Sequence, residues 1–379
     1  MSKRQITIVG GGAAGLAAAV TAARLGARVT ILERADRVGK KILQTGNGRC
    51  NLTNTAAAPD AYNAPDFVLP ALTKYNCASI RRFFLELGLL TYQDAEGRVY
   101  PVSDTASSVL DVLRLACEEN GVQTQCKFEA TRILPDGGIC AADGRHVPAD
   151  AVIVATGGGT GLLKSAGHQI VPFTPVLCPL KTDTVPIRGL SGLRVKCAVT
   201  LLRSGKPQIT LHGELLFRDY GVSGIVIFDL SRYAQPGDLL SIDFLPDLSQ
   251  EEILLLLKHR IQEHPSRTGG TFLTGIFHSR ISAALLRAAG GTDPAMLART
   301  IKGFPLAIQG HGDPKLAQVT RGGASLSSFD PDTLRSRLHA SLYAAGETLN
   351  VDGKCGGFNL HWAFASGILA AQSAMERFV

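Results

Sequence analysis

The sequence of 379 residues lacks the features that mark several classes of protein. No apolar run approaches the roughly 18 residues that a membrane-spanning helix needs, so we expect neither a membrane span nor a membrane partner. It contains no internal repeat and no low-complexity tract, and its residues are 45% apolar and 19% charged. Fibrous, membrane-spanning and disordered classes are therefore excluded, and the length suggests two or three domains, each with its own core.

The eight cysteines form no CxxC pair, and none has zinc-finger spacing to a histidine. We therefore expect neither a disulfide framework nor a metal site, and free thiols in a reducing cytoplasm are the simpler interpretation. An apolar stretch near the start could pass for a signal peptide. Gly10, Gly11, Gly12 and Gly15 interrupt it, however, so we expect a cytoplasmic protein rather than an exported one.

Positive charge is in excess, at a net +7, but it is not concentrated in one segment. Lysines and arginines are scattered, and no basic stretch alternates with aromatic residues as in many nucleic-acid-binding proteins. We interpret the excess mainly as a solvated surface and do not expect nucleic acid as a partner. A protein that modifies RNA remains a rival interpretation.

One glycine-rich segment, GGGAAG at residues 10–15, has the spacing of a dinucleotide-binding turn. A short apolar strand predicted at residues 5–9 precedes it, and an alanine-rich helix predicted at residues 13–25 follows. A second strand, predicted at residues 28–32, completes a β-α-β unit. Because this is the context that such a turn requires, we predict a pyrophosphate site at the start of the helix.

The glycines of this turn have different predicted roles. Gly10 allows the tight turn, Gly12 lets the pyrophosphate approach the backbone, and Gly15 lets helix and strand pack closely. The acid that ends the second strand, Glu33, can accept hydrogen bonds from a ribose diol, which favours FAD or NAD over a 2′-phosphate. The cofactor-binding residues predicted here are Gly10, Gly12, Ala13, Ala14, Gly15, Glu33 and Arg34.

Two later segments favour FAD over NAD. The strand and turn VIVATGG, residues 152–158, resemble the segment that two-dinucleotide-binding flavoproteins place beside FAD. The strand LYAAGE, residues 342–347, resembles the one whose acid binds the ribityl chain, and GKCGGFN, residues 353–359, leads into a helix predicted at 360–375. Amides at that helix start can stabilise negative charge on a reduced flavin. The residues predicted to bind cofactor here are Ala155, Thr156, Gly157, Gly346, Glu347, Gly356, Gly357, Phe358 and Asn359.

The pattern of predicted elements changes near residue 182, from β-α-β units to short strands, and changes back near residue 321. Short runs separated by Pro/Gly turns indicate an antiparallel β module, with strands predicted at 193–202, 208–217, 222–230 and 239–244. Ser249 and Glu252 then form a capping box that opens a helix predicted at 250–263. We predict an FAD-binding domain from residues 1–181 and 322–379, and an inserted β-rich module at 182–321 with a helical part at about 247–303.

Nearly the whole chain resembles one bacterial FAD-binding family, that of the aminoacetone-oxidase-like proteins and 3-dehydro-bile-acid reductases, the bile-acid-inducible N-type flavoproteins. The string GKKILQTGNGRCNLTN at residues 39–54 carries the resemblance most specifically, with YPVS at 100–103, LFRDYGVSG at 216–224 and residues 346–359. It implies an α/β, two-dinucleotide-binding-type (Rossmann-like) FAD fold with an inserted β-barrel-like module and a small helical subdomain. It also implies that the protein is an enzyme, an FAD-dependent oxidoreductase.

The chain departs from this family pattern in two places. Only eight residues, 159–166, separate Gly158 from Gly167, where family members carry a longer segment. Any ligand contact that the longer segment makes is therefore in doubt here. Arg218 stands where a threonine is common, and it either adds an anion contact or lies in solvent.

The loop at residues 45–54 is dense in Gly, Asn and Thr, a composition suited to aiming backbone amides at a phosphate or flavin. Three side chains are candidates for chemistry. Cys50 could be a redox thiol, although packing beside the flavin is favoured. His361 could donate a proton or simply fill the core, and Tyr220 could polarise a carbonyl or belong to an exposed scaffold. Further cofactor-binding residues predicted in this region are Lys40, Lys41, Thr45, Gly46, Asn47, Arg49 and Cys50.

These patterns predict hydride transfer between FAD and a small organic substrate. We favour NAD(P)H-driven reduction of an enone-type C=C bond, such as that of a 3-oxo steroid or bile acid, because the family resemblance implies it. Oxygen-dependent oxidation of a small amine such as aminoacetone stays open, as does a regulatory flavin-binding role. No second G-x-G-x-x-G occurs, so NAD(P)H is expected to bind transiently. The oligomeric state is left open.

Overall fold

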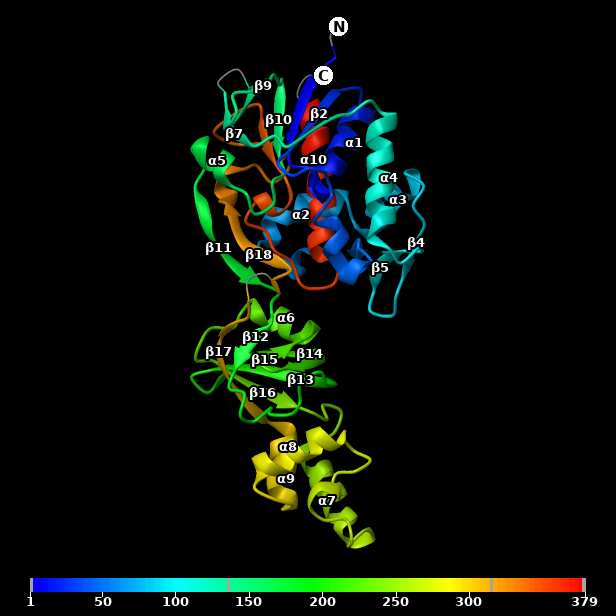
Figure 1. Cartoon of the computed structure of the whole chain (residues 1–379), viewed down its shortest axis with the longest axis vertical. Helices are drawn as coiled ribbons and strands as arrows, with labels where there is room; N and C mark the ends of the chain where they lie inside the picture. Colours follow the sequence, from blue (N-terminus) through cyan, green and yellow to red (C-terminus); the bar gives the residue numbers. More distant parts are fainter. Residues whose placement is uncertain (1–2, 135–136, 314–315, 377–379) are drawn as a thin grey trace. The chain divides into compact units, whose positions relative to one another are not determined.

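The computed structural model describes residues 3–134, 137–313 and 316–376 and divides the chain into two units. Unit 1 comprises residues 1–174 and 320–379, and unit 2 comprises residues 175–319. Each unit has its own hydrophobic core. Unit 2 thus interrupts unit 1 in the sequence (Figure 1).

Unit 1 is built on a parallel sheet with the strand order β19-β10-β1-β2-β6. Its strands are β1 (Gln5–Val9), β2 (Arg28–Glu33), β6 (Gln123–Cys126), β10 (Ala151–Val154) and β19 (Leu342–Ala344). The three central strands, β1, β2 and β10, are short runs rich in Ile and Val, as is typical of strands that are buried on both faces, whereas the edge strand β6 is polar and partly exposed. The register sets Val9 opposite both Leu32 and Val154, so β1, β2 and β10 end at one edge of the sheet. The chain's first, middle and last segments therefore meet there.

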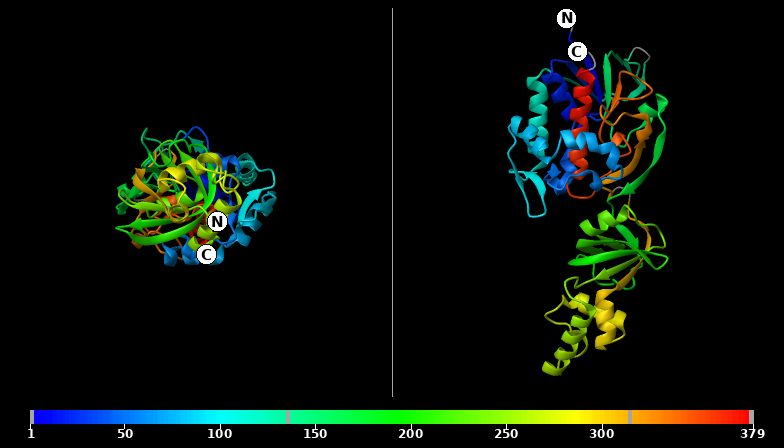
Figure 2. Two further views of the ribbon diagram at one scale, coloured as in Figure 1. Left: turned by 90° about the horizontal axis from the view of Figure 1, so that it is seen from below. Right: turned by 180° about the vertical axis from the view of Figure 1, so that it is seen from behind.

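Helices pack around this sheet (Figures 1 and 2). The long final helix, α10, contacts α1. Gly367 makes this close approach possible, because a Cβ there would overlap the Ala14 carbonyl. The helices of unit 1 are α1 (Ala13–Arg24), α2 (Pro65–Lys74), α3 (Cys77–Glu86), α4 (Ala106–Glu119), α5 (Gly161–Ser165) and α10 (Phe358–Glu376).

Smaller sheets also involve described residues of unit 1. Two are antiparallel, in the orders β3-β5-β4 and β7-β8-β9, and a third pairs β11 with β18. Their strands are β3 (Thr53–Asn54), β4 (Thr91–Gln93), β5 (Arg98–Pro101), β7 (Ala130–Ile133), β8 (Ile139–Ala141), β9 (His146–Val147), β11 (Ile170–Val176) and β18 (Val319–Ala324).

Unit 2 contains a closed six-stranded barrel with the order β12-β15-β14-β13-β16-β17, in which every pair of neighbouring strands is antiparallel. Closure leaves no free sheet edge. The side chains of Leu215, Phe217, Leu240 and Phe304 are buried in its core. The strands are β12 (Leu180–Thr182), β13 (Arg194–Arg203), β14 (Lys206–Arg218), β15 (Gly221–Ser223), β16 (Leu239–Asp243) and β17 (Phe304–His311).

The helices of unit 2 are α6 (Ile225–Ser231), α7 (Gln250–Glu263), α8 (Ser279–Ala289) and α9 (Pro294–Lys302). The last three lie in the connection from β16 to β17. The predicted capping box is confirmed at the start of α7. Ser249 Oγ accepts from the Glu252 amide at 3.2 Å, and Glu252 Oε2 accepts from the Ser249 amide at 2.8 Å. The expected α/β class with an inserted barrel-like module and a helical part is therefore confirmed.

One predicted strand, residues 222–230, is wrong. The strand β15 ends at Ser223, and the helix α6 begins at Ile225. Gly224 separates them with φ +101°, a conformation that L side chains rarely adopt. The apolar run then buries Val226, Ile227 and Leu230, a helical spacing that its β-branched composition concealed.

None of the described helices combines the length and the apolar character needed to cross a lipid bilayer.

Candidate functional site

The turn between β1 and α1 has the geometry of a phosphate cradle. Gly10 has φ +107°, and a Cβ there would overlap the Ala155 carbonyl oxygen. A Cβ on Gly15 would overlap the Gly10 carbonyl oxygen. At Gly12, the residue before α1, a Cβ would meet no described atom within 4 Å. Packing therefore requires glycine at positions 10 and 15, whereas Gly12 faces open space in front of α1. The first turn of α1 carries no acidic residue, so no negative side chain there would repel a phosphate.

The Glu33 carboxylate holds this turn in place. Its Oε2 accepts from the Gly11 amide and its Oε1 from the Ala35 amide, both at 2.7 Å. A carboxylate has about four acceptor positions, so both oxygens can still accept from a ribose. Arg34 is exposed, and Lys40 pairs with Asp36 at the surface.

The predicted middle and terminal segments meet this turn. A Cβ on Gly157 would lie 3.6 Å from Glu347 Oε2, and a Cβ on Gly346 would lie 3.0 Å from the Ala14 Cβ. Thr156 donates from its hydroxyl to the Gly159 carbonyl, which tightens the loop after β10. Three segments far apart in the sequence therefore converge around the start of α1.

Glu347 occupies the centre of this convergence. Its Oε2 lies 2.5 Å from Lys41 Nζ, and its Oε1 accepts from the Thr320 amide at 3.0 Å and hydroxyl at 3.2 Å. Thr320, on β18, was not predicted as a site residue. The sequence offers no signal for it, because it reaches Glu347 only through the tertiary fold.

The loop at residues 45–54 contains several left-handed backbone positions. Asn47 has φ +56° and Cys50 has φ +57°, and Gly46 and Gly48 are also positive. The Cys50 amide donates to the Thr45 carbonyl at 3.1 Å, which closes the loop. The Arg49 guanidinium lies 4.5 Å from the centroid of the Tyr100 ring. Arg49 is exposed and therefore accessible to an anion.

This loop packs against the start of α10. Asn54 Nδ2 donates to the Gly356 carbonyl at 2.9 Å. Gly357 has φ +102°, and a Cβ there would lie 2.6 Å from both Asn51 Oδ1 and the Thr53 carbonyl oxygen. Position 357 therefore requires glycine.

Two of the predicted residues at this helix start make mainly protein contacts. The Asn359 amide group is bound to Gly353 and Lys354, with distances of 2.8 to 3.2 Å. The Phe358 ring makes an edge contact with Tyr62, with centroids 6.3 Å apart. Their roles in cofactor binding stay predictions.

Asn51 Oδ1 provides a test of whether a polar cofactor fits here. It is a buried acceptor that has no hydrogen-bond partner among the described residues. Leaving such an atom without a donor costs about 1–3 kcal/mol. A ligand N–H would remove that cost, so the site fits a polar heterocycle such as the flavin ring. The prediction did not single out Asn51, although it lies in the unusual string at residues 39–54.

The predicted catalytic residues have different environments. Burial raises the pKa of the Cys50 thiol to about 12, so it is a neutral thiol at pH 7. His361 is fully buried, with Nδ1 2.6 Å from Thr53 Oγ1, and burial lowers its pKa to about 4. Tyr220 lies in unit 2, between β14 and β15, and is half-buried. The catalytic roles of all three stay predictions.

The parallel sheet, the glycine turn and the converging segments define a Rossmann-type dinucleotide-binding protein. The model of the HI0933-like protein Rossmann domain matches residues 4–373, and the chain belongs to this family. The chain is 37% identical over 407 residues to 3-dehydro-bile acid delta(4,6)-reductase from Clostridium scindens, covering 98% of this chain and 99% of that one.

Two further comparisons extend this result. The chain is 26% identical over 400 residues to ribosomal RNA dihydrouridine synthase from Escherichia coli, covering 98% of each. Its fold resembles 3-ketosteroid-delta4-(5alpha)-dehydrogenase from Rhodococcus jostii RHA1, solved with 4-androstene-3,17-dione. The TM-score is 0.50 at 15% identity, over 98% of this chain and 96% of that one. The predicted class is confirmed: the protein is an FAD-dependent oxidoreductase.

Proposed function

We propose that this protein reduces a C=C bond conjugated to a carbonyl group, in a 3-oxo steroid of the bile-acid type, with NAD(P)H as the source of electrons. The 37% identity to a 3-dehydro-bile acid reductase across nearly the whole of both chains carries this proposal. We further propose that the two units correspond to the predicted FAD-binding domain and inserted module. The eight free cysteines support the expectation of a reducing cytoplasm.

Residues of unit 1 would hold the cofactor by its polar groups. The amides at the start of α1, next to Gly12, would bind the pyrophosphate, and Glu33 would accept from the adenosine ribose. Glu347, held by Lys41 and Thr320, would accept from the ribityl chain. Asn51 and the amides at the start of α10 would contact the flavin ring.

FAD, when bound, supplies hydride acceptance and donation. Reduction of the conjugated bond adds a hydride to the β carbon and a proton to the α carbon of the substrate. A donor to the substrate carbonyl oxygen would stabilise the negative charge that develops there, and Tyr220 is our candidate. His361 Nδ1 and Thr53 Oγ1 would fix the start of α10 rather than exchange protons with solvent, since the ring is fully buried.

An anaerobic titration tests this proposal. The FAD-loaded protein is mixed with NADH or NADPH, and loss of the visible absorbance of oxidised flavin is recorded. A 3-oxo-Δ4 bile acid is then added, and we expect reoxidation of the flavin with a product heavier by two hydrogens. If neither nicotinamide reduces the flavin, while aminoacetone does so and oxygen reoxidises it, the small-amine oxidase replaces this proposal.

A second candidate, reduction of uridine in RNA, is favoured by the similarity to ribosomal RNA dihydrouridine synthase and by the net charge of +7. The chemistry is related, because the C5=C6 bond of uracil is also conjugated to a carbonyl. The two substrates can be separated by offering the reduced enzyme either a steroid enone or unmodified ribosomal RNA. Dihydrouridine in the RNA, with no turnover of the steroid, would select the second candidate.

A further inference from the structure

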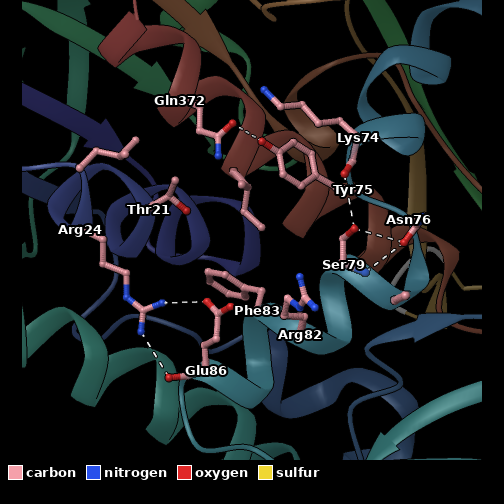
Figure 3. Close-up of a pocket in the computed structure, with 13 residues that line it drawn as sticks. Thr21, Arg24, Lys74, Tyr75, Asn76, Ser79, Arg82, Phe83, Glu86 and Gln372 are labelled. Atoms are coloured by element: carbon pink, nitrogen blue, oxygen red, sulfur yellow. Dashed lines mark hydrogen bonds and ion pairs between the residues drawn. The ribbon is translucent and has the colours of Figure 1, made fainter.

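A pocket of about 630 Å³ opens on unit 1, between the ends of α1 and α10 and the junction of α2 with α3 (Figure 3). It lies away from the predicted cofactor residues. Arg24, on its wall, follows Ala13 by eleven residues, or roughly 16 Å along α1. Ile368 follows Phe358 by ten residues, or roughly 15 Å along α10. Nothing proposed above assigns a ligand to this pocket.

The wall of the pocket carries more positive than negative charge. Arg24, Lys74 and Arg82 line it, and Glu86 is the only carboxylate among the lining residues. Glu86 is engaged with Arg24, with Oε2 3.6 Å from one guanidinium nitrogen and the carbonyl oxygen 3.4 Å from the other. Lys74 and Arg82 form no ion pair among the described residues. Figure 3 shows these cations coming from three different helices.

The same pocket presents apolar and aromatic surface. Leu25 is 49% exposed and Phe83 is half-buried, whereas Ile368 and Tyr75 are buried, at 4% and 9% exposed. The Tyr75 ring is fixed because its hydroxyl donates to Gln372 Oε1. Burial, and after it the nearby Glu376 carboxylate, raise the pKa of Tyr75, so its hydroxyl stays neutral.

We propose that this pocket binds an amphipathic organic anion, that is, a flat apolar ring system carrying one carboxylate, sulfonate or phosphate group. Its volume falls within the range of about 300–1,000 Å³ that small-molecule sites occupy. The ring system would cover Leu25 and Phe83, the large apolar residues of the wall that are not buried. The oxyanion would lie against the Arg82 guanidinium, whose N–H groups suit it. Lys74, whose Nζ lies 5.6 Å from the centroid of the Tyr75 ring, would add positive charge to the same wall. A purely inorganic anion would leave the apolar wall in contact with water.

Calorimetric titration of the FAD-loaded full chain tests the proposal with two probes of the same shape. These are 2-naphthoate, which is an anion, and 2-naphthamide, which is neutral. We expect one saturable site for 2-naphthoate, bound at least about fivefold more tightly than the amide. Arg82→Gln should weaken the affinity for 2-naphthoate by about five- to tenfold and change the affinity for 2-naphthamide by less than about twofold.

Arg114→Gln is the matched control, because this exposed arginine on α4 carries the same charge and does not line the pocket. It should leave both affinities unchanged. A second variant, Ala78→Trp, places a large ring on an exposed position of α3 inside the pocket and should abolish binding of both probes. Its FAD absorbance and unfolding temperature report that it has folded.

Three outcomes would overturn the proposal. The first is that the wild-type protein does not bind 2-naphthoate. The second is equal affinity in wild type, Arg82→Gln and Ala78→Trp, which would place the probe elsewhere, for instance beside the flavin. The third is equal affinity for 2-naphthoate and 2-naphthamide, which would show that the negative charge of the ligand does not contribute to binding. None of these outcomes bears on reduction of a conjugated C=C bond, so this proposal can fail separately from the proposed function.

Discussion

Lys41 Nζ lies 2.5 Å from Glu347 Oε2, an ion pair that joins segments 306 residues apart in the sequence. The two partners differ in exposure, with 63% of the Lys41 side chain accessible and 18% of that of Glu347. The other carboxylate oxygen accepts from the part-buried Thr320 amide. The lysine therefore sits at the outer end of a network whose inner end is fixed to the backbone.

This asymmetry predicts unequal effects of two substitutions on the free energy of unfolding of the cofactor-free protein. Lys41→Gln should cost less than about 1 kcal/mol, because exposed ion pairs contribute little. Glu347→Ala should cost about 1–3 kcal/mol, because the Thr320 amide loses its acceptor. Urea unfolding measures both, with Lys40→Gln at the neighbouring surface pair as control. Equal losses in the Lys41 and Glu347 variants would contradict this interpretation.

The glycine turn predicts a separation between folding and cofactor binding. Gly12→Val should leave the cofactor-free protein within about 1 kcal/mol of wild type, because its side chain enters open space. The same side chain would occupy the place of the pyrophosphate, so the purified protein should lack FAD and its yellow colour. A yellow Gly12→Val protein with bound FAD would refute the assignment of this turn.

Gly15→Ala is the matched comparison and should act on folding instead. Its Cβ would overlap the Gly10 carbonyl, which is backbone that cannot move aside cheaply. We expect a loss of about 3 kcal/mol or more in the free energy of unfolding, or failure to accumulate folded protein. Urea unfolding and the yield of folded protein distinguish the two variants.

Local patterns made the nucleotide-binding unit predictable. The turn at residues 10–15, its flanking strands and Glu33 lie within one short stretch, so spacing alone indicated their arrangement. The contact of Glu347 with the first segment could be anticipated only by resemblance to flavoproteins. Its partner Thr320 carries no signal, because a threonine near the start of a strand is common and only the fold brings it close to Glu347.

The wrong prediction in the inserted module has a similar cause. Residues 225–228 are all apolar and three of the four are β-branched, which favours a strand in isolation. Gly224 at φ +101° ends the strand, and burial of Val226, Ile227 and Leu230 then favours a helix. Tertiary packing overrode local propensity there. By contrast, the capping box of Ser249 and Glu252 is a local interaction, and its prediction is confirmed.

The buried histidine on α10 predicts a loss of stability in acid. Burial lowers the pKa of His361 from 6.5 to about 4 in the folded protein, so the unfolded chain binds a proton at this ring first. The stabilisation is complete above pH 6.5 and is lost as the pH falls toward 4. Its full size is about 3 kcal/mol, and His168, whose pKa burial also lowers to about 4, should add a similar effect.

Urea unfolding of the cofactor-free protein between pH 7 and pH 4.5 measures this loss. His361→Gln should flatten the pH dependence by about 2 kcal/mol over that range, whatever its effect at pH 7. The exposed His212 is the control, and His212→Gln should keep the wild-type slope. An unchanged slope in His361→Gln would show that this ring is protonated equally in the folded and unfolded chains.

The sheet topology leads to a prediction about the order of substrate binding. A dedicated nicotinamide domain would need a second parallel sheet with its own glycine turn. Among the described residues, β19-β10-β1-β2-β6 is the only sheet of three or more strands that is parallel, and its turn is the one predicted to bind FAD. NAD(P)H should therefore bind transiently where the substrate binds, and the two cannot be bound together.

Initial-rate kinetics test this prediction. Initial rates should give parallel lines in a double-reciprocal plot, with each substrate inhibiting competitively against the other at high concentration. Lines that intersect would indicate a ternary complex and would refute the shared site.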